Sequence, residues 1–535
     1  MDEERPGIVG LLDATTNDYG ALSQSSSSFN PTLTTNLDEN GTLNSFNNPL
    51  TTEEARQPLV QTSPSTMGES PDHILNSYGS FNLFILTNFI LMAMVWGLTA
   101  MPMMVSAFLL GDVCVNTTTC TPTPGSISEE FELTGGRSKF ADLTTMSFLL
   151  GNALGANPIS WFSDTRGRRA GLILSLTLFG IFGLLSTLSM NVYFFMFFRL
   201  CQGLLFPGCG VINWVHAYEN SPISLRRWAA LVFGLCWVVG YCLLAPIAYA
   251  FPNWRHLIIA ASLPSLLYAI LLFFVMPESF HFLASTEKRE ELDRWLRSAN
   301  KVSRNPRLDL NADIIISAHH KNQPHSTESG QRRSIFAELL QKRVLLLYTL
   351  ILGYLWSCDS FVYYGISLIS TLLSGAGSKY WSYALTGLVE IPSYLCSPFL
   401  LDLLGRRLFV SICHAITAAA FLGIMFVEDE KWSLILWLIG KFGISCAFTA
   451  LFVYASEVFP TVIRSRCIGL CIILARVAGL FSPLTRLMTT VNPNLPNIFF
   501  TIAAGIGAVV TLFLPETKNK ELPDSVSEVE VEALE

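Results

Sequence analysis

Residues 163–169 read SDTRGRR, and residues 401–407 read LDLLGRR. Both stretches place Asp three residues before Gly-Arg-Arg, and the two copies lie 238 residues apart. Two further pairs keep this offset: ENSPISLR at 219–226 with EVFPTVIR at 457–464, and PES at 277–279 with PET at 515–517. Three landmarks in one register predict an internal duplication, as in membrane transporters built from two parallel six-helix repeats.

Long apolar segments surround these motifs. The chain of 535 residues is 51% hydrophobic and 14% charged, whereas soluble proteins carry about a quarter charged residues. Apolar runs of about 18 residues or more predict transmembrane helices. Twelve such segments lie at about 81–103, 140–163, 170–189, 192–214, 228–250, 256–276, 344–370, 381–401, 408–427, 432–456, 467–488 and 496–514. We therefore predict an all-α membrane protein with twelve transmembrane helices in two pseudo-repeated six-helix bundles.

Polar stretches divide the chain into five parts. Residues 1–78 are rich in Ser, Thr and Asn, a composition that predicts a disordered tail, which we place in the cytosol. The first bundle covers 79–276 and includes an extracellular loop at 104–139. A cytosolic linker with short helices, 277–343, precedes the second bundle, 344–514. An acidic cytosolic tail follows at 515–535.

Basic residues set the expected orientation. The loops and tails on one side of the twelve spans contain 25 Lys and Arg, and those on the other side contain 5. The positive-inside rule then places both termini in the cytosol, and we expect a multi-pass protein of the cell membrane. The loop at 104–139 would face outside, where Asn116 lies in an N-x-T glycosylation sequon. Cys114 and Cys120 in the same loop can form a local disulfide there.

The motifs resemble those of a known family. Asp-x-x-Gly-Arg-Arg after the second span, repeated after the eighth, is similar to the signature of the major facilitator superfamily. Four further stretches resemble its organic ion transporters of cations, anions and zwitterions: FRLCQG (198–203), WRHLIIAASLP (254–264), PESFHFL (277–283) and YASEVFPTVIRS (454–465). The stretches GY (240–241), YYGISL (363–368) and VEIPSY (389–394) look most like the carnitine-type members.

This resemblance implies a carrier whose two halves rock about a central site, so that each conformation needs contacts that the other lacks. Charged residues at the cytosolic helix ends suit that task, although their arginines can also simply set topology. The expected gating network consists of Asp164, Gly167, Arg168, Arg169, Glu219 and Arg226, with Asp402, Gly405, Arg406, Arg407, Glu457 and Arg464 in the second half.

Several ionisable residues lie inside or at the edges of the apolar spans, where a charge needs water or a partner. Arg199 and Lys441 lie early in spans 4 and 10, and each can be structural. Glu390 in span 8 can be structural or can assist ion coupling. The residue pattern does not separate these roles.

Arg476, near the middle of span 11, is the most informative of these charges. The resemblance implies that anion and carnitine-type carriers have Arg at this position, where cation carriers tend to have Asp. A guanidinium matches a carboxylate with two parallel hydrogen bonds. Arg476 is therefore expected to bind an anionic group of the substrate, and the alternative is a permanent salt bridge to Asp359 of span 7. Both hold if a zwitterion places its carboxylate on Arg476 and its ammonium on Asp359.

Aromatic residues complete the expected site, because an aromatic face attracts a quaternary ammonium. Each can equally serve helix packing or the membrane interface. Those in spans 4, 5 and 7 are Trp214, Tyr241, Trp356, Tyr363 and Tyr364.

The sequence lacks a Walker loop, an HExxH motif and a CxxC pair, so an enzyme, a bound cofactor, a metal site or a nucleic-acid partner is not expected. The expected partners are a small organic ion as substrate, membrane lipid, and Na⁺ or H⁺ as a coupling ion. The main hypothesis is a plasma-membrane carrier of organic zwitterions or anions. The alternatives are a carrier of organic cations, with Asp359 as counter-ion, and a transport-inactive receptor or scaffold, since Ser160, Thr165 and Phe280–Phe282 depart from the family pattern.

Overall fold

Helices and the loops between them make up the described part of the chain, in which no strand occurs. The computed structural model describes residues 71–111, 121–303, 306–307, 310–322, 343–373, 377–460, 463–520 and 523. All of them belong to one unit, residues 66–535.

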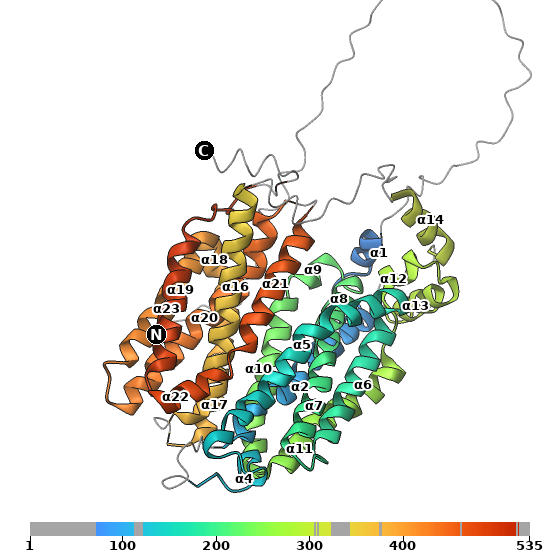
Figure 1. Cartoon of the computed structure of the whole chain (residues 1–535). Helices are drawn as coiled ribbons and strands as arrows, with labels where there is room; N and C mark the ends of the chain where they lie inside the picture. The colour runs from blue at the N-terminus through green and yellow to red at the C-terminus, as the bar shows by residue number, and fades with distance from the viewer. Residues whose placement is uncertain are drawn as a thin grey trace, which may run out of the picture. The chain divides into compact units, whose positions relative to one another are not determined.

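The first half has six membrane-length helical segments, shown in blue to green in Figure 1. They are α2 (Leu83–Met104) with α3 (Ser106–Leu109), α5 (Lys139–Arg166), α6 (Arg168–Ser186), α7 (Val192–Pro207) continuing through the π turn η3 (Gly208–Ile212) into α8 (Asn213–Glu219), α10 (Ala229–Ala250) and α11 (Trp254–Val275). Asparagine side chains cap three of these helices at their N-termini, at Asn82, Asn191 and Asn253.

The second half repeats this pattern, in yellow to red in Figure 1. Its segments are α16 (Arg343–Ile369) with η4 (Ser370–Leu372), α17 (Lys379–Leu388) with α18 (Glu390–Leu404), α19 (Arg406–Ile424), α20 (Glu430–Val458), α21 (Arg464–Leu480) with α22 (Leu484–Val491), and α23 (Leu495–Thr511). Ten of the twelve segments are long and apolar enough to cross a membrane, and α5 and the shorter α23 complete the two sets of six.

Short helices lie outside the spans. They are α1 (Pro71–Tyr78), α4 (Ile127–Glu130), η2 (Gly135–Arg137), α9 (Ile223–Arg226), α12 (Phe280–Ser285), α13 (Arg289–Lys301) and α14 (Ala312–Asn322). The expectation of a disordered tail over 1–78 is therefore wrong for its last eight residues, because α1 buries Ile74 and Leu75. Cys114, Asn116 and Cys120 lie outside the described residues.

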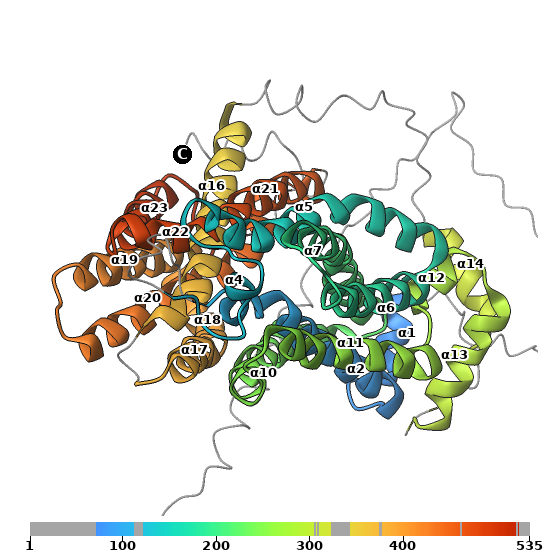
Figure 2. The ribbon, with the colours of Figure 1, turned by 60° about the horizontal axis from the view of Figure 1, so that its bottom comes forward.

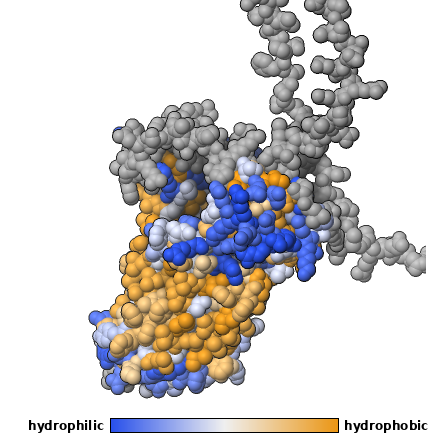
Figure 3. All heavy atoms as spheres, turned by 90° about the vertical axis from the view of Figure 1, so that its right-hand side faces the viewer, coloured by the Kyte–Doolittle hydropathy of each residue, from blue (hydrophilic) through white to orange (hydrophobic). Residues whose placement is uncertain are grey.

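The surface has the apolar belt that a membrane protein needs. Figure 3 shows a hydrophobic band between hydrophilic ends, with a strongly hydrophilic region above it. Many large apolar side chains are exposed, among them Leu267, Phe273 and Phe274 on α11. Lipid covers such a belt at no hydrophobic cost, so the burial of apolar side chains does not by itself hold the helices together.

The two ends of the bundles carry different elements, and we call them the motif end and the opposite end. The motif end carries the turn between α5 and α6 at Gly167 and the turn between α18 and α19 at Gly405. The opposite end carries α4 and α22 (Figure 1), together with α3 and η4, which contact each other. Between the halves, α5 lies against α21 and α10 lies against α17 and α18. Figure 2 shows both neighbourhoods from the opposite end.

Close backbone contact joins α5 to α7 within the first bundle. A Cβ added at Gly203 would lie 2.0 Å from the Phe148 carbonyl oxygen, and one added at Gly155 would lie 1.8 Å from that of Leu204. Real Cβ atoms do not approach that closely, so only glycine permits this packing. Small residues at helix interfaces play this role in membrane proteins.

We predict that Gly203→Ala lowers the melting temperature of the detergent-solubilised protein, because the methyl group must push α7 away from α5, at a cost of roughly 1–3 kcal/mol. Gly469→Ala is the matched control on α21, since nothing lies within 4 Å of its added Cβ. An equal melting temperature for wild type and Gly203→Ala, measured by fluorescence-detected size exclusion, would contradict the packing.

Candidate functional site

The charged motif of the first half forms a closed cluster at the motif end. Arg168 Nε lies 3.0 Å from Glu219, and Arg168 Nη1 lies 3.0 Å from Asp164. Ser279 also donates a hydrogen bond to Glu219. The cluster therefore joins the end of α5 and the start of α6 to the end of α8 and to the segment that follows α11.

The second half repeats these contacts atom for atom. Arg406 Nε lies 2.9 Å from Glu457 and Arg406 Nη1 lies 3.4 Å from Asp402. Thr517 donates to Glu457, as Ser279 does to Glu219. Each contact lies 238 residues from its counterpart, so the offset found in the sequence is also an offset between hydrogen bonds.

Glycine is required at both turns. Gly167 has φ +112° and Gly405 has φ +84°, a region that favours glycine. A Cβ at Gly167 would lie 2.3 Å from Glu278 Oε2, and one at Gly405 would lie 2.6 Å from Glu516 Oε2. Glu278 instead accepts the Arg169 backbone N–H at 2.9 Å, and Glu516 accepts that of Arg406 at 2.8 Å. These carboxylates sit at the N-termini of α6 and α19, where the helix dipole favours negative charge.

The residues of the expected network form two clusters, and each cluster closes within its own bundle. Arg226 pairs with Asp72 of α1 and with the Tyr218 and Ser221 carbonyls. Arg464 donates to the Phe459 carbonyl. Partial burial raises the pKa of Asp72, but the charges and hydrogen bonds of Arg226 and His281 have the larger, opposite effect. The pKa of Asp72 is therefore below its usual value. Asp72 thus stays ionised, and α1 is held to the first bundle.

The remaining two arginines also stay in their own halves. Arg169 donates to the Phe273 carbonyl at 2.6 Å. The backbone N–H of Arg407 donates to Glu516 at 3.1 Å.

We predict that Glu457→Gln and Glu219→Gln lower the melting temperature by similar amounts, because each removes the carboxylate that a mostly buried arginine needs. Hydrogen bonds to charged groups contribute about 1.5–3 kcal/mol. Asp402→Asn is the control, since this carboxylate is 79% exposed and an exposed pair contributes about 1 kcal/mol or less. Opposite or very different shifts for the two glutamate variants would contradict the equivalence of the two clusters.

A second charge cluster lies deep in the spans. Lys441 on α20 lies 2.9 Å from Glu390 on α18, and both side chains are fully buried. Lys441 also donates to Ser367 Oγ at 2.8 Å and lies 3.2 Å from the Tyr363 ring centroid. Tyr363 donates to Glu390 at 3.1 Å and accepts from Trp237 Nε1 at 3.0 Å. Because Trp237 belongs to α10, this cluster links the second bundle to the first.

Arg476 reaches across the same interface at another place. From α21 its Nη1 donates to the Asn152 carbonyl at 2.6 Å and to Asn152 Oδ1 at 3.1 Å on α5. No carboxylate within the described ranges forms an ion pair with it. The neighbouring Gly479 faces the Tyr364 ring and Ser360 of α16. The guanidinium is half-buried, between the two bundles.

Asp359 does not form the expected salt bridge with Arg476. Its carboxylate lies 3.1 Å from His414 Nε2 on α19, and both side chains are fully buried. The physical reason is that side chains at different positions of α16 point in different directions around the helix axis. Asp359 points toward α19, whereas Ser360 and Tyr364 of the same helix face α21.

Arg199 has a structural environment. Its Nη1 donates to the Pro102 carbonyl and to Gln202, and its Nη2 donates to Ser106. The guanidinium also lies over the Phe148 ring, 4.5 Å from the centroid. These contacts hold α7 against α2 and α3.

The predicted aromatic residues take different positions. Tyr241 stacks on Tyr383 of α17 with centroids 4.3 Å apart, so it lies between the bundles. Tyr364 meets Tyr363 edge to face and remains partly buried. Trp214 packs against Trp96 and Phe233 inside the first bundle. Trp356 is 1% exposed in the core of the second bundle, which indicates packing rather than a cavity wall.

The bundles also meet at the opposite end. Arg486 of α22 lies 3.8 Å from the buried Asp142 of α5 and donates to the Gly111 carbonyl. Thr371 of η4 donates to the Ala107 carbonyl at 3.2 Å. The Phe108 ring stacks on Tyr380, with centroids 5.6 Å apart. Ionic, polar and aromatic contacts therefore close this end.

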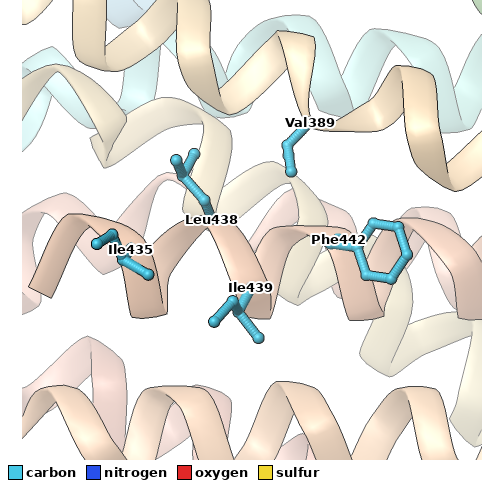
Figure 4. Close-up of a pocket in the computed structure, with 5 residues that line it drawn as sticks. All are labelled: Val389, Ile435, Leu438, Ile439 and Phe442. Atoms are coloured by element: carbon cyan, nitrogen blue, oxygen red, sulfur yellow. The ribbon is translucent and has the colours of Figure 1, made fainter. Parts of the chain in front are cut away.

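A pocket of about 240 Å³ lies between the α17–α18 junction and α20, and its lining is wholly apolar (Figure 4). Val389 and Phe442 are among its walls. None of the charged residues described above lines it, so an organic ion has no counter-charge there.

Sequence reasoning missed several of these residues. Asn152, Trp237 and Tyr383 gave no signal, because polar or aromatic residues in a span are common. Asp142, His414 and Arg486 did give one, since an ionisable residue in or beside an apolar span suggests function. Their partners come from distant helices and were not readable.

Comparison with known proteins gives the family. A model of the family described as sugar (and other) transporter matches residues 126–526. A putative transporter of Caenorhabditis elegans, B0252.3, is 34% identical over 459 residues, which cover 86% of this chain and 91% of the relative. The chain belongs to this transporter family. Its members are transporters and not enzymes.

Relatives and solved structures add detail. The organic cation transporter protein of Drosophila melanogaster is 28% identical, covering 75% of this chain and 73% of the relative. Organic anion transporter 3 of Oryctolagus cuniculus is 27% identical, covering 76% and 75%. The inward-open xylose transporter XylE from E. coli has a TM-score of 0.62 at 17% identity, covering 84% and 99%. The predicted all-helical major facilitator fold is confirmed.

Proposed function

We propose that this protein is a secondary carrier of small organic zwitterions or anions, with a carnitine-like arrangement of charge, in the plasma membrane. The observation that carries the proposal is Arg476. It is a permanent cation between the bundles, and its partner among the described residues is the uncharged Asn152. A carrier site needs a charge of this kind, held in place but not neutralised.

A substrate carboxylate would compete well for this guanidinium. The planar guanidinium donates two parallel hydrogen bonds to a carboxylate, and these are stronger than those to a neutral amide. Tyr364 lies beside Gly479 of the same helix and offers a ring face to an ammonium group. Asp359 is engaged by His414, so the aromatic face replaces it as the proposed site for the positive end of a zwitterion.

The places where the bundles touch support alternating access. Their contacts through Arg486, Thr371 and Phe108 lie at the opposite end, while the motif-end clusters close within each bundle. We place the motif end in the cytosol, on the excess of Lys and Arg in its loops. Transport then requires the opposite-end contacts to break as the halves rock.

We predict that Arg476→Gln lowers uptake of L-carnitine and hippurate about ten- to hundredfold, because a hydrogen-bonded charge pair contributes about 1.5–3 kcal/mol. Uptake by Arg476→Lys should lie between that of wild type and that of Arg476→Gln, since lysine keeps the charge and loses the planar fork. Radiolabelled uptake into cells, normalised to surface expression, measures this.

Arg466→Gln is the matched control, an exposed arginine on the same helix. Carboxylate uptake by Arg476→Gln at the wild-type level would refute the proposed role.

We further predict that a disulfide between Ala107→Cys and Thr371→Cys blocks uptake and that dithiothreitol restores it, because it holds the opposite end closed. The two single variants control for reaction of native cysteines. Full uptake after complete cross-linking would show that the bundles do not separate there.

Organic cations are a second candidate for the substrate class. One contact in the structure favours them. The Tyr363 ring already binds a cation, the Lys441 ammonium, at 3.2 Å. Uptake of tetraethylammonium, lost in Glu390→Gln and unaffected in Arg476→Gln, would decide for this candidate. Absence of uptake of all three probes despite surface expression would favour a receptor or scaffold.

A further inference from the structure

The buried pair of Asp359 and His414 has an unusual proton requirement. His414 Nδ1 lies 2.9 Å from the Val410 carbonyl oxygen. A carbonyl oxygen only accepts hydrogen bonds, so Nδ1 carries a hydrogen. His414 Nε2 then faces the Asp359 carboxylate at 3.1 Å. If Nε2 carried no hydrogen and Asp359 were ionised, two lone pairs would face each other.

One additional proton removes this conflict. It makes either an imidazolium beside a carboxylate or a neutral imidazole beside a carboxylic acid, and the pair is neutral overall in both cases. Neither carboxylate oxygen nor Nε2 has another nitrogen or oxygen hydrogen-bond partner among the described residues. Loss of the proton would leave an unbalanced negative charge in the membrane interior, which is costly unless water enters.

The surroundings do not offer a competing charge. Cys358 on α16 and Cys413 on α19 are the titratable neighbours, and Cys446 of α20 lies against Cys413. Of the other ionisable residues on the packed helices, Lys441 pairs with Glu390 and Arg476 binds Asn152. From α23, Gly507 packs on the His414 ring, where a Cβ would lie 2.6 Å from Cδ2. The ring is therefore held in its orientation.

The pair is also connected to the bundle interface. Asp359 precedes Tyr363 by four residues on α16, which is about one helical turn. Tyr363 receives the hydrogen bond of Trp237 from the first bundle and donates to Glu390. A rocking motion that breaks the Trp237 contact would therefore act on α16 one turn from the proton.

We propose that Asp359 and His414 form a proton-binding site whose proton is coupled to substrate movement. The proposal rests on the carrier function proposed above. In the conformation described, the proton lies between Asp359 and Nε2. When the halves rock and water reaches the pair, the proton passes to water, leaving the carboxylate and neutral imidazole, and a proton from water restores the pair. Coupling requires that the two conformations hold this proton with different affinity.

A metal ion is the competing occupant, because the ligand atoms of Cys358, Asp359 and His414 lie within 4.8 Å of one another. The proton is favoured for two reasons. First, Asp359 and His414 are already in direct contact at 3.1 Å. Second, one proton between them balances the charge of the pair without a third ligand.

The test uses the purified full-length protein in liposomes, with the membrane potential clamped. The probes are L-carnitine, hippurate and tetraethylammonium, each assayed for exchange and for accumulation driven by a pH difference. With one proton per substrate, a pH difference of one unit supports up to about tenfold accumulation. Wild type should show it, and a proton-sensitive dye trapped inside should report one proton per substrate.

Asp359→Asn mimics the protonated pair, because its amide can donate to Nε2. We expect this variant to retain exchange and to lose pH-driven accumulation. His216→Gln is the matched control, a fully buried histidine whose side-chain partners are the neutral Asn88 and Asn220. It should keep both activities.

The outcomes separate the two proposals. Absence of exchange with all three probes refutes the carrier function. Exchange without pH-driven accumulation in wild type refutes proton coupling, even if Asp359→Asn fails to fold. Accumulation that persists in Asp359→Asn refutes the assignment to this pair. Stoichiometric zinc in the purified wild type that Asp359→Asn lacks would assign the pair to a metal instead.

Discussion

A charge inside a membrane must find a partner or water, and this constraint organises the whole interior of the protein. Glu390 neutralises Lys441, His414 faces Asp359, and Asp142 faces Arg486. Arg199 instead donates to a carbonyl, an amide and a hydroxyl. Because lipid gives no hydrophobic force between helices, these contacts and the glycine-mediated approach of α5 to α7 decide which helices pair.

Arg476, like Arg199, has no charged partner among the described residues, but it lies between the two bundles. Asn152 accepts hydrogen bonds from the guanidinium but does not neutralise its charge. The contact also joins the two bundles, so whatever binds the guanidinium acts on the interface directly. A residue with these two properties suits a site at which ligand binding and conformational change are the same event.

The duplication has a physical meaning beyond ancestry. Each half closes its own charge cluster with the same donor, acceptor and glycine geometry, as Arg168 with Glu219 and Arg406 with Glu457 show. A bundle held together internally at the motif end can move as one body. The contacts between the bodies are fewer and of a different kind, and they include the aromatic stacking of Tyr241 on Tyr383. Such an interface can break and re-form without unfolding either half.

The sequence by itself determined the fold class, the twelve spans and the internal repeat, because apolar length and a fixed offset are local or linear properties. It also identified Arg476 and Glu390 as charges in need of an explanation. Only the tertiary structure decided the partners. It paired Asp359 with His414 and left Arg476 to Asn152, it turned Trp356 into a core residue, and it kept the motif clusters within their own bundles. The reason is that a helix points successive side chains about 100° apart, so which neighbour each one meets depends on how the helices are rotated and packed.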